Sequence, residues 1–219
     1  MKTHIWRRIL LWGGAVILLV ALVIVAAVLV SDNTTPAIVE KDLAPAVNAS
    51  DHTLGSATST VTLVEYADFQ CPACQAYFPL LQKLTTDYQS KILFVYRYFP
   101  LPQHPNAVPA AEAAEAASLQ GKFWPMHDLL FGHYQDWENL SDPTPIFIQY
   151  ATQLGLNVTK FQSDMQSDAV KNVVNADLAS ATSENLQGTP SFYLNGKYIQ
   201  NPPNYDAFKT LIDNALQSK

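Results

Sequence analysis

The chain has 219 residues, of which 48% are hydrophobic and 15% are charged, a balance typical of a globular protein and not of a disordered one. Its formal net charge is −6, which excludes the basic surface that a nucleic-acid-binding protein needs. Two cysteines are too few for a scaffold held by several disulfides, and a chain of this length can bury its own hydrophobic core.

The first predicted element is a hydrophobic run over residues 9–30, which contains no charged residue and no proline. About 20 apolar residues are needed to span the core of a bilayer. Because Lys2, Arg7 and Arg8 precede the run, the positive-inside rule places the N-terminus in the cytoplasm and the rest of the chain outside. A cleaved signal peptide is the alternative, but its apolar stretch is usually only about 7–15 residues long. We therefore expect residues 1–30 to form a single-pass transmembrane anchor.

Residues 31–58 are rich in Ser, Thr, Ala, Pro and Asp, and their apolar residues follow no periodic pattern. Such a composition is typical of a flexible linker. All 19 acidic side chains follow Ser31 together with 10 basic ones, so the chain beyond the anchor has a net charge of −9. We expect this linker to carry a single extracytoplasmic domain, residues 59–219, clear of the membrane.

Two strands separated by a helix are predicted at the start of this domain. A run of β-branched and apolar residues from Thr60 to Phe69 predicts a buried strand, and residues 91–100 predict a second one. Between them, apolar residues recur at helical spacing from Tyr77 to Tyr88. A strand, a helix and a strand in this order indicate a βαβ unit with parallel strands and a right-handed crossover.

The middle of the domain, from about residue 104 to residue 186, contains several helical patterns and no strand-like run. Two short strands are predicted after it, at residues 191–194 and 197–200. They are separated by Asn195-Gly196, which is a strong hairpin signal. Apolar residues at helical spacing from Tyr205 to Leu216 predict a final amphipathic helix. The predicted order is therefore βαβ, a helical block, and ββα.

The two cysteines lie at the predicted junction of a strand and a helix, as Cys71-Pro72-Ala73-Cys74. A bridge across two residues closes too small a loop to stabilise a fold much, so the pair is better suited to chemistry. Unpaired N–H groups and the helix dipole at a helix N-terminus favour a thiolate on Cys71. Cys74, one turn into the helix, would be more buried and would resolve a mixed disulfide formed by Cys71.

Two other features suit thiol–disulfide exchange. Glu65 lies on the predicted buried strand, six residues before Cys71, where its carboxyl would have a raised pKa and could relay a proton to or from Cys74. The alternative is an acid at a strand end that is solvated or hydrogen-bonded. Thr189-Pro190 lies at a turn between helix and strand, where a cis peptide bond would leave the Thr189 backbone free to pair with an extended peptide. The alternative is an ordinary trans proline in a loop.

Four segments, in order between residues 60 and 219, together resemble the DsbA-like branch of the thioredoxin superfamily. They are Glu65-Tyr-Ala-Asp-Phe-Gln-Cys-Pro-Ala-Cys, Tyr98-Phe-Pro-Leu-Pro-Gln-His-Pro-Asn-Ala, Gln120-Gly-Lys-Phe-Trp-Pro-Met-His-Asp and Gly188-Thr-Pro-Ser-Phe-Tyr-Leu-Asn-Gly. The resemblance implies an α/β thioredoxin-like fold, βαβ plus ββα, with an inserted helical domain. It also implies a cis Pro190 packed against the active-site sulfurs and a buried acid at Glu65. We expect Thr189, Pro190, Pro72 and Ala73 to contact the substrate.

The sequence therefore predicts an exported thiol–disulfide oxidoreductase that donates the Cys71–Cys74 disulfide to cysteine-containing exported proteins. This redox-active disulfide would be its only redox group, with no other cofactor and no metal. The resemblance implies a membrane partner that reoxidises the pair, either DsbB-like or similar to vitamin-K-epoxide reductase. Ala73 stands where the best-known oxidising members have histidine, which predicts a milder oxidant and leaves a reductase or isomerase as the alternative. A copper metallochaperone and a binding module with an inert cysteine pair are alternatives from other classes.

Overall fold

The computed structural model describes residues 36–43 and 45–218. The hydrophobic run over residues 9–30 lies outside this part, so the transmembrane anchor stays a prediction. Among the described residues, no helix has both the length and the apolar character that a membrane span requires. The described residues belong to one compact unit, Thr35–Lys219.

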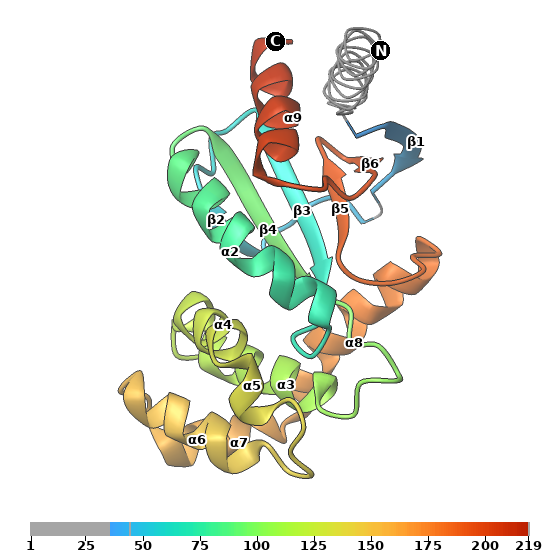
Figure 1. The fold of residues 1–219 in the computed structure, drawn as a ribbon. Coiled ribbons are helices and arrows are strands. Elements are labelled where there is room, and N and C mark those ends of the chain that lie inside the picture. The colour runs from blue at the N-terminus through green and yellow to red at the C-terminus, as the bar shows by residue number, and fades with distance from the viewer. Residues whose placement is uncertain (1–35, 44, 219) are drawn as a thin grey trace, which may run out of the picture. The chain divides into compact units, whose positions relative to one another are not determined.

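A mixed β-sheet forms the centre of this unit. Its strands, within the described residues, are β1 (Ile38–Asp42), β2 (His52–Gly55), β3 (Val61–Ala67), β4 (Ile92–Tyr98), β5 (Ser191–Leu194) and β6 (Lys197–Ile199). Their order across the sheet is β1-β6-β5-β3-β4-β2 (Figure 1). β3 and β4 are parallel, with Glu65 opposite Tyr96, whereas the other neighbouring pairs are antiparallel. Helix α2 (Pro72–Asp87) connects β3 to β4 and completes the predicted βαβ unit.

The segment between β4 and β5 is helical, and a last helix, α9 (Tyr205–Gln217), follows the β5–β6 hairpin. The inserted helices are α3 (Ala107–Ser118), α4 (Phe123–Gly132), α5 (Tyr134–Trp137), α6 (Thr144–Gln153), α7 (Val158–Met165) and α8 (Asp168–Ser183). This order of elements confirms the predicted thioredoxin-like fold with a helical insertion.

Helices α2 and α9 cover one face of the sheet, in front of the strands in Figure 1. Leu81 and Leu84 of α2 and Phe208 and Ile212 of α9 are buried in one cluster with strand residues such as Leu63. Each side chain of this size contributes about 1.5–3 kcal/mol when it is buried. This packing holds α2, and hence the residues at its N-terminus, in a fixed position on the sheet.

The inserted helices pack against the C-terminal ends of β3 and β4. Phe69, just after β3, stacks on Tyr96 with ring centroids 5.2 Å apart and contacts Phe131 of α4 at 4.9 Å. The rings of Tyr96 and Phe123 are 5.6 Å apart. Cys71 and Cys74 belong to this same buried cluster. The cysteine pair therefore lies at the boundary between the sheet and the insertion.

The prediction that residues 31–58 form a flexible linker is wrong for part of this segment. Within it, β1 and β2 are strands at the two edges of the sheet. β1 pairs with β6 and β2 pairs with β4, both in antiparallel fashion. Most side chains of β2 are exposed, so these strands lack the apolar pattern that identifies a buried strand. Their pairing depends on backbone hydrogen bonds to strands that are distant in the sequence.

A buried ion pair holds the segment between β1 and β2 against the sheet. Arg97 of β4 is 1% exposed and donates from Nε and Nη2 to the two carboxylate oxygens of Asp51, at 2.7 and 3.0 Å. Its Nη1 also donates to Pro45 O and to Tyr66 Oη, each at 2.9 Å. A bidentate pair with all its donors used can balance the cost of removing both charges from water.

We expect Asp51→Asn to lower the free energy of unfolding by about 3 kcal/mol, because it leaves the buried Arg97 charge without its bidentate partner. The double variant Asp51→Asn/Arg97→Met should recover much of this loss. Urea denaturation at pH 7 measures both values. The control is Lys209→Ala, which breaks an exposed pair with Asp213 and should leave the midpoint unchanged. If Asp51→Asn behaves like this control, the buried pair does not hold the segment.

Candidate active site

The predicted active-site residues lie where β3 ends and α2 begins. Cys71 is the N-cap residue of α2 and has an extended backbone, with φ −73° and ψ 121°. Pro72 follows in the first turn of α2, where its fixed φ suits the helix and its missing N–H removes no hydrogen bond. Cys71 is thereby held at the positive end of the α2 dipole.

The thiol of Cys71 is the more acidic of the pair. Cys71 is 6% exposed, and its Sγ lies 3.4 Å from the carbonyl oxygen of Thr189. A hydrogen bond from Cys74 is the largest influence that lowers the pKa of Cys71, to about 5, and backbone N–H groups of Cys74 and Ala73 act in the same direction. Burial opposes them without outweighing them. Cys71 is therefore a thiolate at neutral pH when the two cysteines are reduced, as they are in this structure.

Cys74 has the opposite character. It lies one turn further into α2 and is 1% exposed. Burial raises the pKa of its thiol well above the usual value, and the neighbouring charges of Glu65 and Cys71 raise it further. At neutral pH the reduced pair therefore consists of a charged Cys71 and a protonated Cys74.

Glu65 lies on β3 behind the two cysteines and is 2% exposed. Burial raises the pKa of its carboxyl from 4.5 to about 8, and the negative charge of Cys71 contributes to the increase. The carboxyl is therefore largely protonated at pH 7. This confirms the expected buried acid with a raised pKa, and excludes a solvated carboxylate at a strand end.

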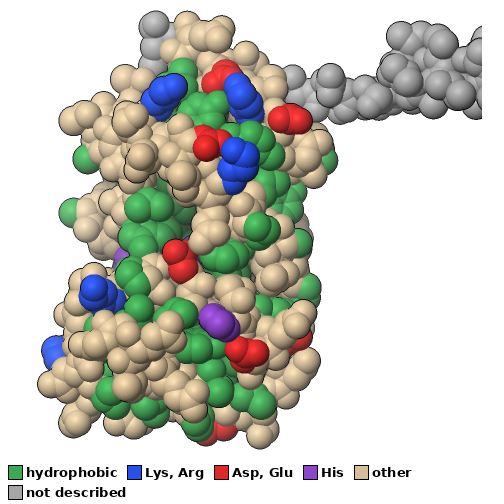
Figure 2. Space-filling model, turned by 60° about the vertical axis from the view of Figure 1, so that its left-hand side comes forward, with side chains coloured by type: hydrophobic (Ala, Val, Ile, Leu, Met, Phe, Trp, Pro, Cys, Tyr) green, Lys and Arg blue, Asp and Glu red, His purple; other side chains and the backbone are tan. Residues whose placement is uncertain are grey.

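A cavity of about 500 Å³ between α2 and α4 extends to both Cys74 and Glu65. Its walls combine hydrophobic and polar residues in about equal measure, with His127 and Asp128 of α4 among the polar ones. Burial lowers the pKa of His127, whose Nδ1 lies 3.0 Å from a carboxylate oxygen of the half-exposed Asp128. Figure 2 shows hydrophobic side chains on the middle of one face of the molecule, with charged side chains of both signs gathered in its upper part. The cavity gives the buried carboxyl of Glu65 a route for proton exchange.

The loop before Cys71 is fixed to the helical insertion by Gln70. Tyr134 Oη donates to the carbonyl oxygen of Gln70 at 2.9 Å. The Gln70 side chain donates from Nε2 to Glu138 O at 2.6 Å and accepts from the backbone N–H of Asn106 at 2.5 Å. Two parts of the insertion, the start of α3 and the segment of α5 with its C-cap, therefore hold Gln70, the immediate neighbour of Cys71.

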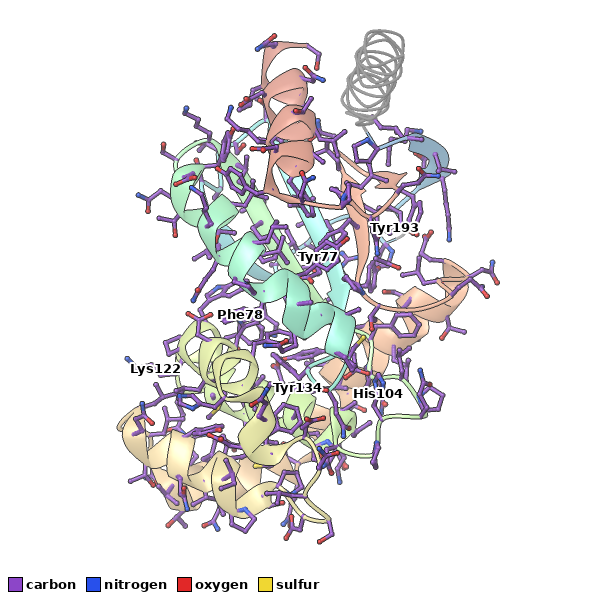
Figure 3. The ribbon with its side chains drawn as sticks, viewed as in Figure 1. Tyr77, Phe78, His104, Lys122, Tyr134 and Tyr193 are labelled. Atoms are coloured by element: carbon purple, nitrogen blue, oxygen red, sulfur yellow. The ribbon has the colours of Figure 1, made fainter. Side chains whose placement is uncertain are left out.

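Asp68 fixes the start of the same loop. Its Oδ1 accepts from the Gln70 N–H at 2.7 Å, and its Oδ2 accepts from Leu101 N at 2.9 Å and lies 2.6 Å from His104 Nδ1. Figure 3 shows Tyr134 and His104 near the start of α2. The sequence prediction did not include Asp68 or Gln70. The sequence offered one signal for these two residues, which is their position between a buried strand and Cys71. Polar residues at such a position must find hydrogen-bond partners.

The structure brings the predicted residues together around Cys71. The Thr189–Pro190 peptide bond is cis, as predicted. Pro72 and Ala73 are exposed beside the buried cysteines. Within the described part of the chain, no group of three or more His, Cys, Asp or Glu side chains is arranged to hold a metal ion.

Comparison with known proteins identifies the family. A family model described as thioredoxin matches residues 47–214. The chain belongs to the thioredoxin family. Among solved structures, a thioredoxin-like oxidoreductase from Silicibacter pomeroyi is 26% identical with a TM-score of 0.64, and the match covers 77% of this chain and 93% of that one. BdbD from Bacillus subtilis has the same fold, at 24% identity and a TM-score of 0.69, with 83% and 98% of the two chains covered.

Wolbachia pipientis alpha-DsbA1 also shares this DsbA-like form of the thioredoxin fold, at 21% identity and a TM-score of 0.69 over 78% of this chain and 94% of that one. Curated relatives are longer proteins. One named Na(+)/H(+) antiporter NhaA 3, from Salinispora tropica, is 37% identical over 177 residues, which are 80% of this chain. The chain spans about a quarter of its length, 26%. The family match and the fold together place the Cys71-Pro72-Ala73-Cys74 segment in a thioredoxin-family site.

The acidity of Cys71 in this thioredoxin-family site can be measured directly. In the reduced protein, the ultraviolet absorbance of the thiolate should titrate with a midpoint near pH 5. Cys74→Ala should raise this midpoint because it removes the hydrogen bond that contributes most to the low pKa. Cys71→Ser should show no thiolate in the acidic range. A midpoint near the ordinary cysteine value of about 8.5 would contradict the geometry described for Cys71.

Glu65→Gln should stabilise the reduced protein at neutral and alkaline pH. Because the folded-state pKa of about 8 lies above the unfolded value of 4.5, the folded state holds this proton more tightly. Stability from this group is therefore present below about pH 4.5 and is lost as the pH rises toward 8. We expect a gain of about 2 kcal/mol or more at pH 8 and little change at pH 4, measured by urea denaturation. The exposed acid Asp136, changed to Asn, is the control. An equal effect of Glu65→Gln at both pH values would rule out a buried titrating carboxyl.

Proposed function

We propose that the chain is an extracytoplasmic oxidase that donates the Cys71–Cys74 disulfide to cysteine-containing exported proteins. The low pKa of Cys71 carries this proposal. A stabilised thiolate favours the reduced form of the pair, so the oxidised pair gives up its disulfide readily. Ala73 adds no positive charge beside Cys71, and the stabilisation comes instead from Cys74 and the start of α2. We therefore expect a milder oxidant than a relative with histidine at this position.

Disulfide transfer proceeds in two exchange steps. A thiolate of the substrate attacks Sγ of Cys71, a mixed disulfide forms, and the Cys71–Cys74 bond breaks with its electron pair on Cys74. A second substrate thiolate then attacks the substrate sulfur of the mixed disulfide, and Cys71 leaves as a thiolate. Two electrons pass from the substrate to the cysteine pair, and the substrate gains one disulfide.

Glu65 supplies the proton that this chemistry requires inside the protein. Cys74 leaves as a buried thiolate, which is costly unless it is protonated at once. Glu65 carries a proton at pH 7 and lines the same cavity as Cys74. It donates this proton to Cys74 and recovers one through the cavity beside His127 and Asp128. When the pair is reoxidised, Glu65 accepts the proton of Cys74 before the new disulfide closes.

The substrate approaches Cys71 from the exposed side of the loop. Pro72 and Ala73 are exposed there, and the Thr189 carbonyl lies 3.4 Å from the Cys71 sulfur. An extended peptide bonded to Cys71 lies within reach of the Thr189 backbone and of Pro190. These four residues form the proposed substrate contact surface.

The location and the redox partner of the enzyme follow from its N-terminal sequence and from the direction of electron flow. The apolar run of residues 9–30 behind Lys2, Arg7 and Arg8 supports a membrane anchor with the catalytic domain outside the cytoplasm. The curated relatives that contain a similar segment are named Na(+)/H(+) antiporters, which also supports a place at the membrane. A donor of disulfides must be reoxidised, and a DsbB-like or vitamin-K-epoxide-reductase-like membrane protein is the proposed acceptor of its electrons.

The reduction potential of the full-length chain tests this direction of electron flow. The chain, solubilised in detergent, is equilibrated with glutathione buffers, and the fraction of disulfide is measured by thiol labelling. An oxidase should have a potential at or above the secretory-compartment range of about −180 to −210 mV. A value near that of thioredoxin, about −270 mV, would instead assign the enzyme to the reductases or isomerases. Cys71→Ser is the control and should show no redox transition.

A further inference from the structure

A second hollow, of about 450 Å³, lies beside the Thr189–Pro190 loop. One wall comes from β1, through Val39 and Lys41. The other walls come from residues 185–191, Tyr198 and Asn201. The N-terminal edge strand and the loop after α8 thus enclose a site that is separate from the cavity at Glu65 and Cys74.

This hollow is connected to the reacting sulfur through Thr189, while Cys71 itself does not line it. Thr189 lines it, and the carbonyl oxygen of the same residue lies 3.4 Å from Cys71 Sγ. An extended peptide advances about 3.3 Å for each residue. A substrate that is bonded to Cys71 through its cysteine can therefore place a neighbouring side chain in the hollow. Asn201 fixes the loop in place, because its Nδ2 donates to Pro190 O at 2.8 Å.

The walls of the hollow combine apolar side chains, such as Val39 and Leu186, with polar ones, and they carry one positive charge. Lys41 is the charged residue among those that line it, while Asn185, Gln187 and Asn201 offer neutral amides. Lys41 Nζ is 4.0 Å from a carboxylate oxygen of Glu184, whose side chain is only 6% exposed. This carboxylate accepts the Tyr193 hydroxyl at 3.0 Å and does not line the hollow. Among the described side chains, the ammonium group of Lys41 therefore lines the hollow and no carboxylate does.

We propose that this hollow is a substrate subsite that accepts an acidic side chain close to the cysteine of the exported polypeptide. The inference rests on the proposed function and adds a substrate preference to it. Beyond the predicted anchor the chain has a net charge of −9, so acidic segments are repelled by most of its surface. Lys41 provides a positive charge beside the active site, which attracts an acidic side chain where most of the surface repels it. It acts as a specificity-determining residue and takes no part in the bond exchange.

A set of dithiol peptides tests this preference with the full-length oxidised chain. The peptides differ in one residue, which is Glu, Gln or Lys, placed in turn at each of three positions on either side of the reacting cysteine. Stopped-flow fluorescence records the second-order rate at which each peptide reduces the Cys71–Cys74 disulfide. At one position or more, the Glu peptide should react about two- to five-fold faster than the Lys peptide at low salt. The ratio should fall as salt screens the charges.

Variants of Lys41 separate its charge from other effects. Lys41→Gln should remove the preference for Glu, so that the Glu, Gln and Lys peptides react at similar rates. Lys41→Arg should retain the preference. The matched control is Lys122→Gln. It removes the same charge from an exposed position at the start of α4, where Figure 3 labels Lys122.

Each result of this experiment has a definite meaning. Equal rates for Glu and Lys peptides in the unmodified chain, or a preference that survives in Lys41→Gln, would overturn the proposed subsite. In both cases the neutral peptide is still oxidised, so the proposed function stands. If no peptide of the set reduces the disulfide at an appreciable rate, the proposed oxidase function fails together with the subsite.

Discussion

The thiols of Cys71 and Cys74 and the carboxyl of Glu65 share one buried site, and the interior can hold little more than one negative charge among them. Burial raises the pKa of Glu65 and of Cys74, the charge on Cys71 raises the pKa of Glu65 further, and the charges of both raise the pKa of Cys74 further. The start of α2 and the hydrogen bond from Cys74 decide that the charge resides on Cys71. The two inner groups then remain protonated. This distribution makes Cys71 a good leaving group and keeps a proton ready for Cys74.

The helical insertion contributes to this distribution by holding the loop before Cys71. Gln70 is hydrogen-bonded to Tyr134, Glu138 and Asn106, and Asp68 interacts with the chain after β4 through Leu101 and His104. If this loop could move, Cys71 would leave the end of the α2 dipole and lose the N–H groups that stabilise its thiolate. The insertion therefore positions the reactive sulfur although it contributes none of the reacting groups.

The central part of the fold could be predicted because its signals are local. β3, α2 and β4 each have a continuous apolar pattern, and the spacing of Glu65 and Cys71 along one strand and its following turn places both at the same site. β1 and β2 could not be recognised, because they are short and mostly exposed. The segment between them is held by the pair of Asp51 and Arg97, which are 46 positions apart. The four-residue helix α5 is too short for a periodic pattern, and the contacts of Gln70 join residues 36 to 68 positions apart.

Reduction and proton uptake are coupled in this site by the same electrostatics. In the disulfide form Cys71 carries no charge, so the electrostatic part of the raised pKa of Glu65 is absent and only burial remains. When the disulfide is reduced, the thiolate appears on Cys71, and the carboxyl of Glu65 then binds its proton more tightly. Reduction at a pH near the pKa of Glu65 therefore takes up protons at Glu65 as well as at Cys74. The redox state of the cysteine pair in this way sets the proton content of the buried site, and the cavity between α2 and α4 is lined by both groups that take up the protons, Glu65 and Cys74.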